Sequence, residues 1–387
     1  MSVHALPPIA DWHGFEPTRA AALRRLHAVR PHDYARSRNH LQGAVTGLSP
    51  YITHGVLTLP EVLEAVQQAE LQRSGQRLAV GHKFSQELAW REYFHHVWRH
   101  EGSAIFDSLN PGPLPDGAYA RTLDDDIRSA STGVPAIDQA VRTLYATGWL
   151  HNHARMWLAS YVVHIRKVHW RIGADWLYAH LIDGDLASNH LSWQWVAGTG
   201  SHKPYLFNAE NVARFAPPAW HSPRSVIDRS YEALDEIARC DRRLAGAPRA
   251  GHAAGIEEPA TTQAPPFELP RATAASLRGA WLMHPWALRA PPAGTRAVGV
   301  FVAAFHRRWR WSARRWQFVR DAMHEHCEQV LWCEDPPPAS SAAVADPHLG
   351  DWWPPGAGET VPQLWNDPGR RCGSFSQFWR CIGAARG

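Results

Sequence analysis

Residues 181–205 read LIDGDLASNHLSWQWVAGTGSHKPY, and this stretch decides the fold. The carboxylates of Asp183 and Asp185 flank a glycine, the amide of Asn189 follows, and two tryptophans precede a Gly-Thr-Gly turn. A carboxylate beside a conformationally free glycine lets the backbone and the side chain approach a planar, hydrogen-bonding ligand closely. Packing alone explains such a string of polar groups poorly, so the stretch predicts a ligand site.

A metal site is the alternative interpretation of the two acidic residues. The loop lacks the further ligands that a calcium-binding EF-hand carries at fixed spacing. His151 and His153 stand two residues apart and point in different directions on a helix, which argues against a shared ion. We therefore expect no metal.

The segment 148–157, GWLHNHARMW, places Asn152, Arg155 and Met156 on one face of a helix. A buried arginine needs a carboxylate partner, because an unpaired buried charge is costly. Asp183 is the candidate, so we expect an ion pair between Arg155 and Asp183.

The segment 86–98, QELAWREYFHHVW, aligns Glu87, Trp90 and Arg91 on one helical face. Considered alone, its aromatic residues are a core stripe and its charges lie on the surface. Together with the other segments, the same face is interpreted as part of the ligand site.

The segment 44–55, AVTGLSPYITHG, puts Thr46, Gly47, Leu48 and Ser49 just before a helical run. Small residues and hydroxyls at the N-terminus of a helix offer free N–H groups and a positive dipole end to a phosphate. Most Ser-Pro steps are merely helix caps, so this segment is a weak signal when taken alone.

The composition is that of a globular protein with an unusual tryptophan content. The 387 residues are 45% hydrophobic and 20% charged, enough for one sizeable core and a second, smaller unit. The 20 tryptophans either fill a helical core or stack on bases and carry electrons to a redox cofactor. A net charge of +4 permits a polyanionic partner but does not prove one.

The cysteines and the N-terminus bear on the cellular compartment. Five cysteines without a CxxC pair support neither a disulfide framework nor a zinc site, so we expect reduced thiols. No apolar run approaches the roughly 20 residues of a membrane span, and the N-terminus lacks a basic start followed by an apolar segment. We expect a cytoplasmic protein that does not enter a membrane.

The chain is predicted to be mainly α, with an all-helical domain followed by a small α/β unit. Apolar residues at spacings of three and four predict successive helices, among them 58–71, 83–100, 135–147, 151–169 and 174–181. The stretch 245–270 is rich in Ala, Pro, Gly and Thr and is interpreted as a linker that cannot order itself. Beyond it, strands over 297–303 and 329–333 enclose a helix over 312–326, which indicates a small parallel sheet before a Pro-rich, irregular stretch. The predicted division is a helical domain at 1–240, a linker at 241–278 and an α/β unit at 279–387.

In this order, the segments resemble the FAD-binding domain of the photolyase and cryptochrome family. The resemblance covers residues 33–215 and rests on the joint occurrence of LSPY, WREY, GWLHNHARM, WR-x-G and DGDLASN-x-x-x-WQW. It implies a photolyase-type helical fold that binds FAD.

The resemblance also implies roles for single residues. Asn189 matches the position that faces flavin N5, where photolyases carry a neutral amide and plant-type cryptochromes an acid. Asp185 would accept the imide N–H of the flavin, and the ion pair of Arg155 and Asp183 would lie over the ring. The implied cofactor-binding residues are Tyr34, Thr46, Gly47, Leu48, Ser49, Arg91, Asn152, Arg155, Asp183, Asp185 and Asn189. Glu87, Trp90, Met156 and Trp195 match the pocket for a flipped-out pyrimidine dimer, and Trp193 and Trp170 match the first two tryptophans of the electron-transfer chain.

The sequence also departs from the family pattern. The flavin domain begins almost at once, so we expect the usual N-terminal antenna domain to be missing and predict no antenna pigment. The third, outer tryptophan falls near Ile127, and His153 replaces an arginine. PYLFNAEN at 204–211 stands where the family has PYFRIFNP, which removes an arginine suited to a phosphate contact. The segment 370–380, RRCGSFSQFWR, is similar to the SxFTPFW element of the antenna domain and suggests a rearranged remnant of that domain.

The resemblance implies a deoxyribodipyrimidine photo-lyase, a carbon–carbon lyase in which light-excited, reduced FAD donates an electron to a pyrimidine dimer in damaged DNA. The alternative is a cryptochrome-type blue-light or redox sensor without repair activity. The altered loop and the interrupted tryptophan chain favour that alternative. A flavin-dependent enzyme with another substrate is the third interpretation.

Overall fold

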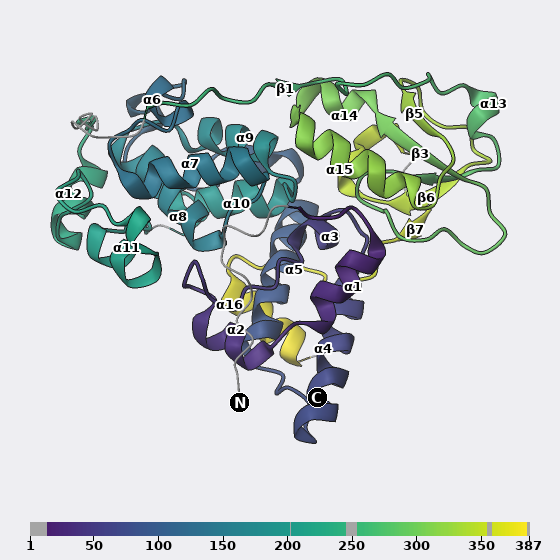
Figure 1. Ribbon diagram of the computed structural model, residues 1–387, viewed down its shortest axis with the longest axis horizontal. Helices are drawn as coiled ribbons and strands as arrows, with labels where there is room; N and C mark the ends of the chain where they lie inside the picture. Colours follow the sequence, from purple (N-terminus) through teal and green to yellow (C-terminus); the bar gives the residue numbers. More distant parts are fainter. Residues whose placement is uncertain (1–13, 202, 245–253, 354–357, 385–387) are drawn as a thin grey trace.

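The computed structural model describes residues 14–201, 203–244, 254–353 and 358–384, which form a helical half and an α/β half (Figure 1). Residues 1–13, on which the expectation about a leader segment falls, and residues 245–253 of the expected linker lie outside the described residues. Within the described ranges, no helix combines the length and the apolar character that crossing a bilayer requires. The chain is mainly α, as the sequence predicts.

The helical half is built around α10, Leu186–Ala197, whose residues are buried around most of its circumference. Asp185 caps this helix by accepting the backbone N–H of Ser188 at 2.7 Å, and Gly198 ends it with a φ of 83°. The helix packs against α5, α8 and α9, so its N-terminal turn lies deep in the bundle. The other helices of this half are α1 Arg19–His27, α2 Pro31–Ser37, α3 Ser49–Thr53, α4 Leu59–Ser74, α5 Lys83–Glu101, α6 Asp125–Arg128, α7 Pro135–Thr147, α8 Asn152–Ser160, α9 Trp170–His180, α11 Ala209–Phe215 and α12 Tyr231–Arg239.

The sequence predicts one helix over 151–169, and this prediction is wrong. The α-helix α8 ends at Ser160, and a π-helical turn over Tyr161–Ile165 follows. Lys167 then takes a φ of 49°, in the left-handed region that ends a helix, and Val168 forms an isolated strand bridge. Two backbone carbonyls at the end of α12 hold the buried ammonium of Lys167. A tertiary contact, which has no local sequence pattern, therefore ends the helix early.

The α/β half contains a five-stranded parallel sheet in the order β5-β3-β2-β6-β7. The two predicted strands are observed as β3, Ala297–Val302, and β5, Val330–Cys333, with α15, Ala313–His324, between them. The strand order reverses between β2 and β6, as in doubly wound sheets. The sequence did not predict the short strands β2 Trp281–Met283, β6 Ala342–Ala345 and β7 Glu359–Thr360. The other elements of this half are α13 Ala274–Leu277, α14 Ala303–Arg308 and the antiparallel pair of β1 Thr261–Thr262 with β4 Trp311–Ser312.

Residues 254–273 of the expected linker lie along the molecule and are attached to it. The carboxylate of Glu258 accepts the indole N–H of Trp176 at 2.9 Å and pairs with Arg128 at 2.5 Å and His180 at 2.9 Å. Further along, β1 pairs with β4 of the α/β half. Polar contacts and the partly buried side chains of Ile256, Phe267 and Leu269 hold this segment, although its composition did not indicate an ordered structure.

The end of the chain returns from the sheet to the helical half. The last helix, α16, Phe375–Ala384, packs against α5 (Figure 1). The buried carboxylate of Glu92, on α5, accepts the backbone N–H groups of Leu364 and Trp365. Asp367 pairs with an imidazole of α5 at 2.9 Å and with a guanidinium of α5 at 2.6 Å. The segment 364–384 is therefore fastened to the helix that also carries the WREY motif.

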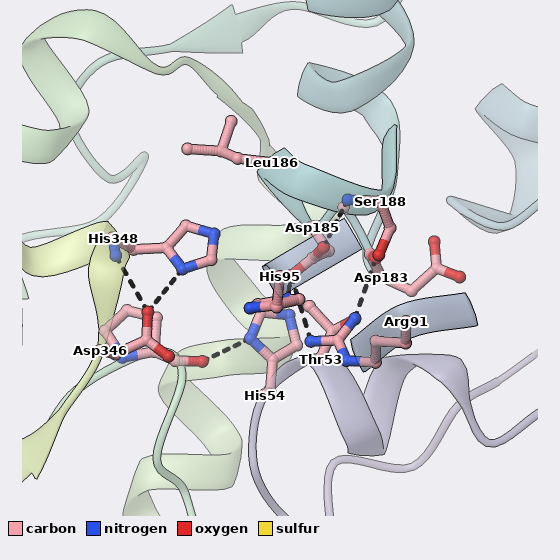
Figure 2. Close-up of polar contacts among 12 residues, drawn as sticks. Thr53, His54, Arg91, His95, Asp183, Asp185, Leu186, Ser188, Asp346 and His348 are labelled. Carbon is pink, nitrogen blue, oxygen red and sulfur yellow. Dashed lines mark hydrogen bonds and ion pairs between the residues drawn. The ribbon is translucent and has the colours of Figure 1, made fainter. Parts of the chain in front are cut away.

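His54, directly after α3, joins the two halves. Its ring nitrogens lie 2.5 Å from the carbonyl oxygen of Pro285 and 2.7 Å from that of Ile182 (Figure 2). Its own carbonyl accepts the N–H of Leu288 at 2.9 Å. Gly55 has a φ of 65°, and a Cβ there would lie 2.5 Å from a carbonyl oxygen of the α/β half. The two backbones therefore meet without room for a side chain, and buried residues of both halves form one core.

Replacing Glu92 by alanine should loosen the segment 364–384, because two buried backbone N–H groups lose their acceptor. An unsatisfied buried donor costs about 1–3 kcal/mol, so we expect the free energy of unfolding to fall by about that amount in urea titrations. Hydrogen exchange of the amides in 364–384 should accelerate. Glu64→Ala, which removes an exposed acid of α4, is the control. Exchange in 364–384 that is equal in Glu92→Ala and the wild type would contradict the anchoring role.

Candidate functional site

A cavity of about 710 Å³ lies in the helical half, bounded by α5, α8, α10 and the loop that leads into α3. It gathers residues that are widely separated in the sequence. Among the site residues that the sequence predicts, those lining the cavity are Tyr34, Thr46, Gly47, Ser49, Glu87, Trp90, Arg91, Asn152, Arg155, Met156, Asp183, Asp185, Asn189, Trp193 and Trp195. Leu48 belongs to the same loop, but its side chain is buried in the core, and Trp170 lies outside the cavity lining.

Asp183 and Arg155 form the ion pair that the sequence predicts. One guanidinium nitrogen of Arg155 lies 2.7 Å and 3.0 Å from the two carboxylate oxygens of Asp183. The Nε of Arg155 donates to the carbonyl of Leu150 at 2.7 Å, which fixes the orientation of the guanidinium. The pair therefore places a defined cation and anion side by side at the cavity wall.

Asp185 is held by three donors, two of them from α5 (Figure 2). Its carboxylate lies 3.1 Å from a guanidinium nitrogen of Arg91 and 2.9 Å from Nε2 of His95, and it accepts the N–H of Ser188. Burial alone would raise the pKa of the Asp185 carboxyl, but Arg91 and His95 outweigh burial and hold that pKa well below its usual value. The carboxylate therefore stays ionised and remains a hydrogen-bond acceptor.

Thr53 connects this cluster to α3. Its hydroxyl lies 3.3 Å from a guanidinium nitrogen of Arg91 and donates to the backbone carbonyl of Asp183 at 3.2 Å (Figure 2). This one hydroxyl therefore connects the end of α3, the middle of α5 and the turn that carries Asp183 and Asp185, here called the acidic turn.

The loop before α3 forms another part of the wall. Gly47 has a φ of 61°, a conformation that glycine adopts without strain. The hydroxyl of Ser49 accepts the indole N–H of Trp149 at 3.0 Å. Across this end of the cavity, burial raises the pKa of the Tyr34 phenol, which therefore stays neutral. These groups offer neutral hydrogen-bonding partners and no carboxylate.

Asn189 lies one turn along α10 from Asp185. Its amide nitrogen donates to the carbonyl of Ala174 at 2.9 Å, which leaves the amide oxygen to act as an acceptor toward a ligand. The adjacent Ser188 has a buried hydroxyl for which the described residues provide no hydrogen-bond partner. Polar groups at the first turn of α10 are therefore available to a bound molecule.

Glu87 stands on the cavity wall between two cations. Its carboxylate pairs with Lys83 at 2.7 Å and with Arg38 at 3.3 Å, and all three side chains are about one quarter to one third exposed. These partners hold the carboxylate at the edge of the cavity, where a substrate can reach it.

Aromatic rings form the rest of this wall. The indole of Trp90 is stacked on the ring of Phe375, with centroids 4.0 Å apart and an interplanar angle of 8°. Phe375 does not line the cavity, so it backs Trp90 from outside. Trp195 is 37% exposed and lies 5.4 Å from the ring of Tyr205, which belongs to the altered PYLFNAEN loop.

The predicted electron-transfer tryptophans are both buried. Trp193 lies against α9 at Gly173, where a Cβ would lie 2.3 Å from the indole. Trp170 donates its indole N–H to the hydroxyl of Ser108 at 2.9 Å. Ile127, near the expected position of the third tryptophan, is fully buried in the core.

His95, Thr53 and His348 are not among the site residues that the sequence predicts. His95 follows Arg91 by four residues, so helical spacing was a signal that placed it on the same face. His348 belongs to the α/β half, where Asp346 binds it at 2.6 Å (Figure 2), and it contributes to the low pKa of Asp185. Nothing in the local sequence connects His348 to the flavin-type motifs.

One group of potential metal ligands occurs in the described ranges, away from this cavity. Ligand atoms of His96, His100 and Asp367 lie within 4.8 Å of one another. Nε2 of His96 accepts the N–H of Cys372 at 3.0 Å, and Arg99 binds Asp367. Hydrogen bonds and ion pairs therefore account for this cluster as the anchor of the C-terminal segment.

Comparison with known proteins places the cavity in a family context. Residues 84–220 match the family model described as the FAD binding domain of DNA photolyase. A deoxyribodipyrimidine photo-lyase of Synechococcus sp. is 34% identical over 220 residues, covering 53% of this chain and 44% of that protein. A deoxyribodipyrimidine photo-lyase of Streptomyces griseus is 35% identical over 173 residues, covering 44% of this chain and 36% of that protein. The chain thus spans less than half the length of these two relatives.

Cryptochromes and solved structures also match. A chloroplastic/mitochondrial cryptochrome DASH of Oryza sativa subsp. japonica is 32% identical over 171 residues, covering 43% of this chain and 29% of that protein. The crystal structure of a bacterial class III photolyase from Agrobacterium tumefaciens matches with 27% identity and a TM-score of 0.46, covering 54% of this chain and 46% of that chain.

The residues of the cavity fit FAD. An ionised Asp185 can accept an imide N–H of the flavin, and the amide oxygen of Asn189 can accept a further N–H. The buried hydroxyl of Ser188 has no partner among the described residues, and a polar ligand would satisfy it. A volume of about 710 Å³ is within the usual range for cofactor sites.

Replacing Asp185 by asparagine should weaken FAD binding, because it removes a charged acceptor and leaves Arg91 and His95 without their anion. A hydrogen bond to a charged group contributes about 1.5–3 kcal/mol, so we expect the dissociation constant of FAD to rise by about 10- to 100-fold. Titration of the apoprotein by flavin fluorescence measures it. Asp321→Asn, on the outer face of α15, is the control. An unchanged affinity in Asp185→Asn would show that this carboxylate does not contact the cofactor.

Proposed function

Since residues 84–220 are an FAD-binding domain of the photolyase and cryptochrome family, we propose that this protein is a deoxyribodipyrimidine photo-lyase. In this reaction, light drives electron transfer from reduced FAD to a pyrimidine dimer in DNA. Two relatives named deoxyribodipyrimidine photo-lyase, at 34% and 35% identity, support the proposal. The residues at the cavity supply independent support.

The observation that carries the proposal is the joint presence of two sets of residues in one cavity. The first set is Asp183, Asp185 and Asn189, which are buried and lie at the start of α10 or just before it. Glu87 and Trp90, from α5, line the same space. A flavin held by the first set would therefore be next to a substrate held by the second.

When bound, reduced FAD supplies the electron that opens the cyclobutane ring and receives it back after both carbon–carbon bonds have broken. The residues of the chain position the reactants. Asp185 would accept the imide N–H of the ring, and Asn189 would present a neutral amide that does not repel an anionic reduced flavin. The burial of α10 strengthens polar contacts made at its first turn.

The part of the cavity wall formed by Glu87, Trp90 and Trp195, here called the outer wall, is suited to a base that has left the DNA duplex. Unstacking costs a few kcal/mol, and less for a damaged base. Stacking of bases on aromatic rings contributes about 1–3 kcal/mol per base, which offsets that cost. Trp90 and Trp195 provide such rings, and Glu87 provides an acceptor for the N–H groups of the bases. Lys83 and Arg38, beside Glu87, add positive charge for the phosphate backbone.

Replacing Glu87 by alanine should reduce repair by at least about tenfold while FAD binding persists, because the substrate loses a charged hydrogen-bond partner. The assay illuminates the reduced protein with an oligonucleotide that contains a thymine dimer and quantifies restored thymines. Glu64→Ala, on the exposed side of α4, serves as the control. A wild-type protein that holds photoactive FAD but leaves the dimer intact would refute the repair function.

Replacing Phe375 by alanine should weaken dimer binding without affecting FAD. Stacked aromatic pairs contribute about 0.5–1.5 kcal/mol beyond burial, so loss of the brace behind Trp90 should lower the affinity for dimer-containing DNA by about 2- to 10-fold. Fluorescence anisotropy with labelled oligonucleotide measures this affinity. Ser376→Ala, the next and exposed position of α16, is the matched control. If Phe375→Ala binds the dimer as tightly as Ser376→Ala, Trp90 does not depend on this brace.

A light or redox sensor is the second candidate function. The buried isoleucine near the position of the third tryptophan and the contact between Trp90 and the C-terminal helix favour it. Flavin photoreduction without binding of dimer-containing DNA would support the sensor over the lyase.

We also propose that the chain is divided into a helical domain at 1–240, a linker at 241–278 and an α/β domain at 279–387. The parallel sheet and the FSQFW helix support the interpretation of the last part as a rearranged antenna-type domain. The return of α16 to α5 means that its final segment packs on the helical domain.

A further inference from the structure

Arg315 of the α/β half reaches the acidic turn of the flavin site. It lies on α15, is fully buried, and donates from Nη2 to the backbone carbonyl of Gly184 at 2.5 Å. Gly184 separates Asp183 from Asp185, so the guanidinium contacts the peptide that links the two carboxylate-bearing residues. None of the family motifs includes this arginine.

The close approach of Arg315 explains why a glycine occupies position 184. A Cβ on Gly184 would lie 2.6 Å from Nη1 of Arg315 and 3.0 Å from the backbone oxygen of Tyr178. From the sequence, we expect this glycine to let a ligand approach the turn closely. In the structure, the side of Gly184 that would carry a Cβ faces Arg315 and α9.

The guanidinium is held in place by aromatic rings. Its central carbon lies 4.8 Å from the centre of the Tyr178 ring and 4.1 Å from the centre of the Trp311 ring. Arginine stacked on aromatic faces is rigid, and stacking partly replaces lost hydration. The contact to Gly184 is therefore made by a preorganised group.

The two acids of the turn lie close enough to Arg315 to influence its pKa. Its Nε and Nη1 have no hydrogen-bond partner among the described residues, although the side chain is fully buried. Burial lowers the pKa of the guanidinium, while Tyr178, Asp183 and Asp185 act in the opposite direction. An arginine in a protein remains protonated under such conditions. A buried cation without direct anionic contacts thus interacts through space with both carboxylates.

The neighbouring histidines do not share this positive charge. Burial and the adjacent Arg315 lower the pKa of His54 to about 3. The same two causes hold the pKa of His306 well below its usual value. At neutral pH, Arg315 is accordingly the cation of the α/β half that donates to the carbonyl of Gly184.

We propose that Arg315 is a positioning residue of the flavin site, which fixes the Asp183-Gly184-Asp185 turn and adds a buried positive charge behind it. The proposal rests on FAD binding by this cavity and is independent of the repair reaction. A cation fixed behind this turn would favour an anionic reduced flavin over the neutral oxidised form, so we expect it to raise the midpoint potential. The α/β half thereby takes part in cofactor binding through a residue outside the helical domain.

The test compares Arg315→Met and Arg315→Lys with the matched control Arg314→Met in the full-length protein. Arg314 is exposed on the same helix and donates to the carbonyl of Ala146. Loss of a hydrogen bond from a charged group should raise the dissociation constant of FAD about tenfold or more in Arg315→Met. Its flavin midpoint potential should fall, whereas Arg315→Lys should keep a potential near that of the wild type. Both quantities are measured in the dark without DNA.

Gly184→Ala provides a second approach that keeps the arginine, since the added Cβ displaces the guanidinium. It should reproduce the weaker FAD binding of Arg315→Met, and it remains informative if that variant fails to fold. Wild-type affinity and potential in folded Arg315→Met or Gly184→Ala would overturn the proposal. A wild-type chain that binds FAD but does not repair dimers would refute only the photo-lyase function, and one that binds no FAD would refute both.

Discussion

Two buried carboxylates on one short turn, Asp183 and Asp185, impose the requirement that the rest of the structure satisfies. A buried charge without a partner costs several kcal/mol, so the fold must bring cations to this turn. They arrive from three separate elements: Arg155 from α8, Arg91 from α5 and Arg315 from α15. Because each cation is fixed to a different helix, the turn determines how these helices approach one another. The same cations keep Asp185 ionised and fix the position of Asp183, so both carboxylates can serve as hydrogen-bond acceptors for a polar cofactor.

The helix α5 shows how one amphipathic element serves several contacts at once. Glu87 and Arg91, four residues apart, face the cavity, and Trp90 lies beside them. Glu92 and His96, also four residues apart, face the segment 364–384 and bind its backbone N–H groups. A rotation of α5 would therefore disturb the acidic turn, the outer wall and the C-terminal anchor together. This coupling explains why the helix carries so many charged and aromatic residues yet packs in the core.

The helices of the helical half were largely predictable from the sequence, because apolar residues at spacings of three and four within each segment indicate them. Helical spacing put Arg155 on one face, and a buried arginine needs an acid, which led to Asp183. Contacts between distant segments left no such pattern. The early end of α8 depends on Lys167 reaching carbonyls of α12, and the linker is attached through the carboxylate of Glu258 and the pairing of β1 with β4. The strands β6 and β7 were missed because they are short and lie in a Pro-rich stretch, where parallel neighbours rather than side-chain alternation define them.

The cavity is supported from outside by residues from the last part of the chain. Arg315 stands behind the acidic turn, and Phe375 stands behind Trp90 on the wall assigned to substrate. The two residues belong to different elements, α15 and α16, and neither lines the cavity. The helical half supplies the groups that contact a ligand, while the α/β half and the C-terminal helix limit the positions that those groups can take. A motif search within the helical half finds the contacts but not their supports, since a residue that acts through Gly184 or Trp90 has no ligand-binding chemistry of its own. The hydrogen bond from Arg315 to Gly184 and the stacking of Phe375 on Trp90 thus connect the cavity wall to the last part of the chain.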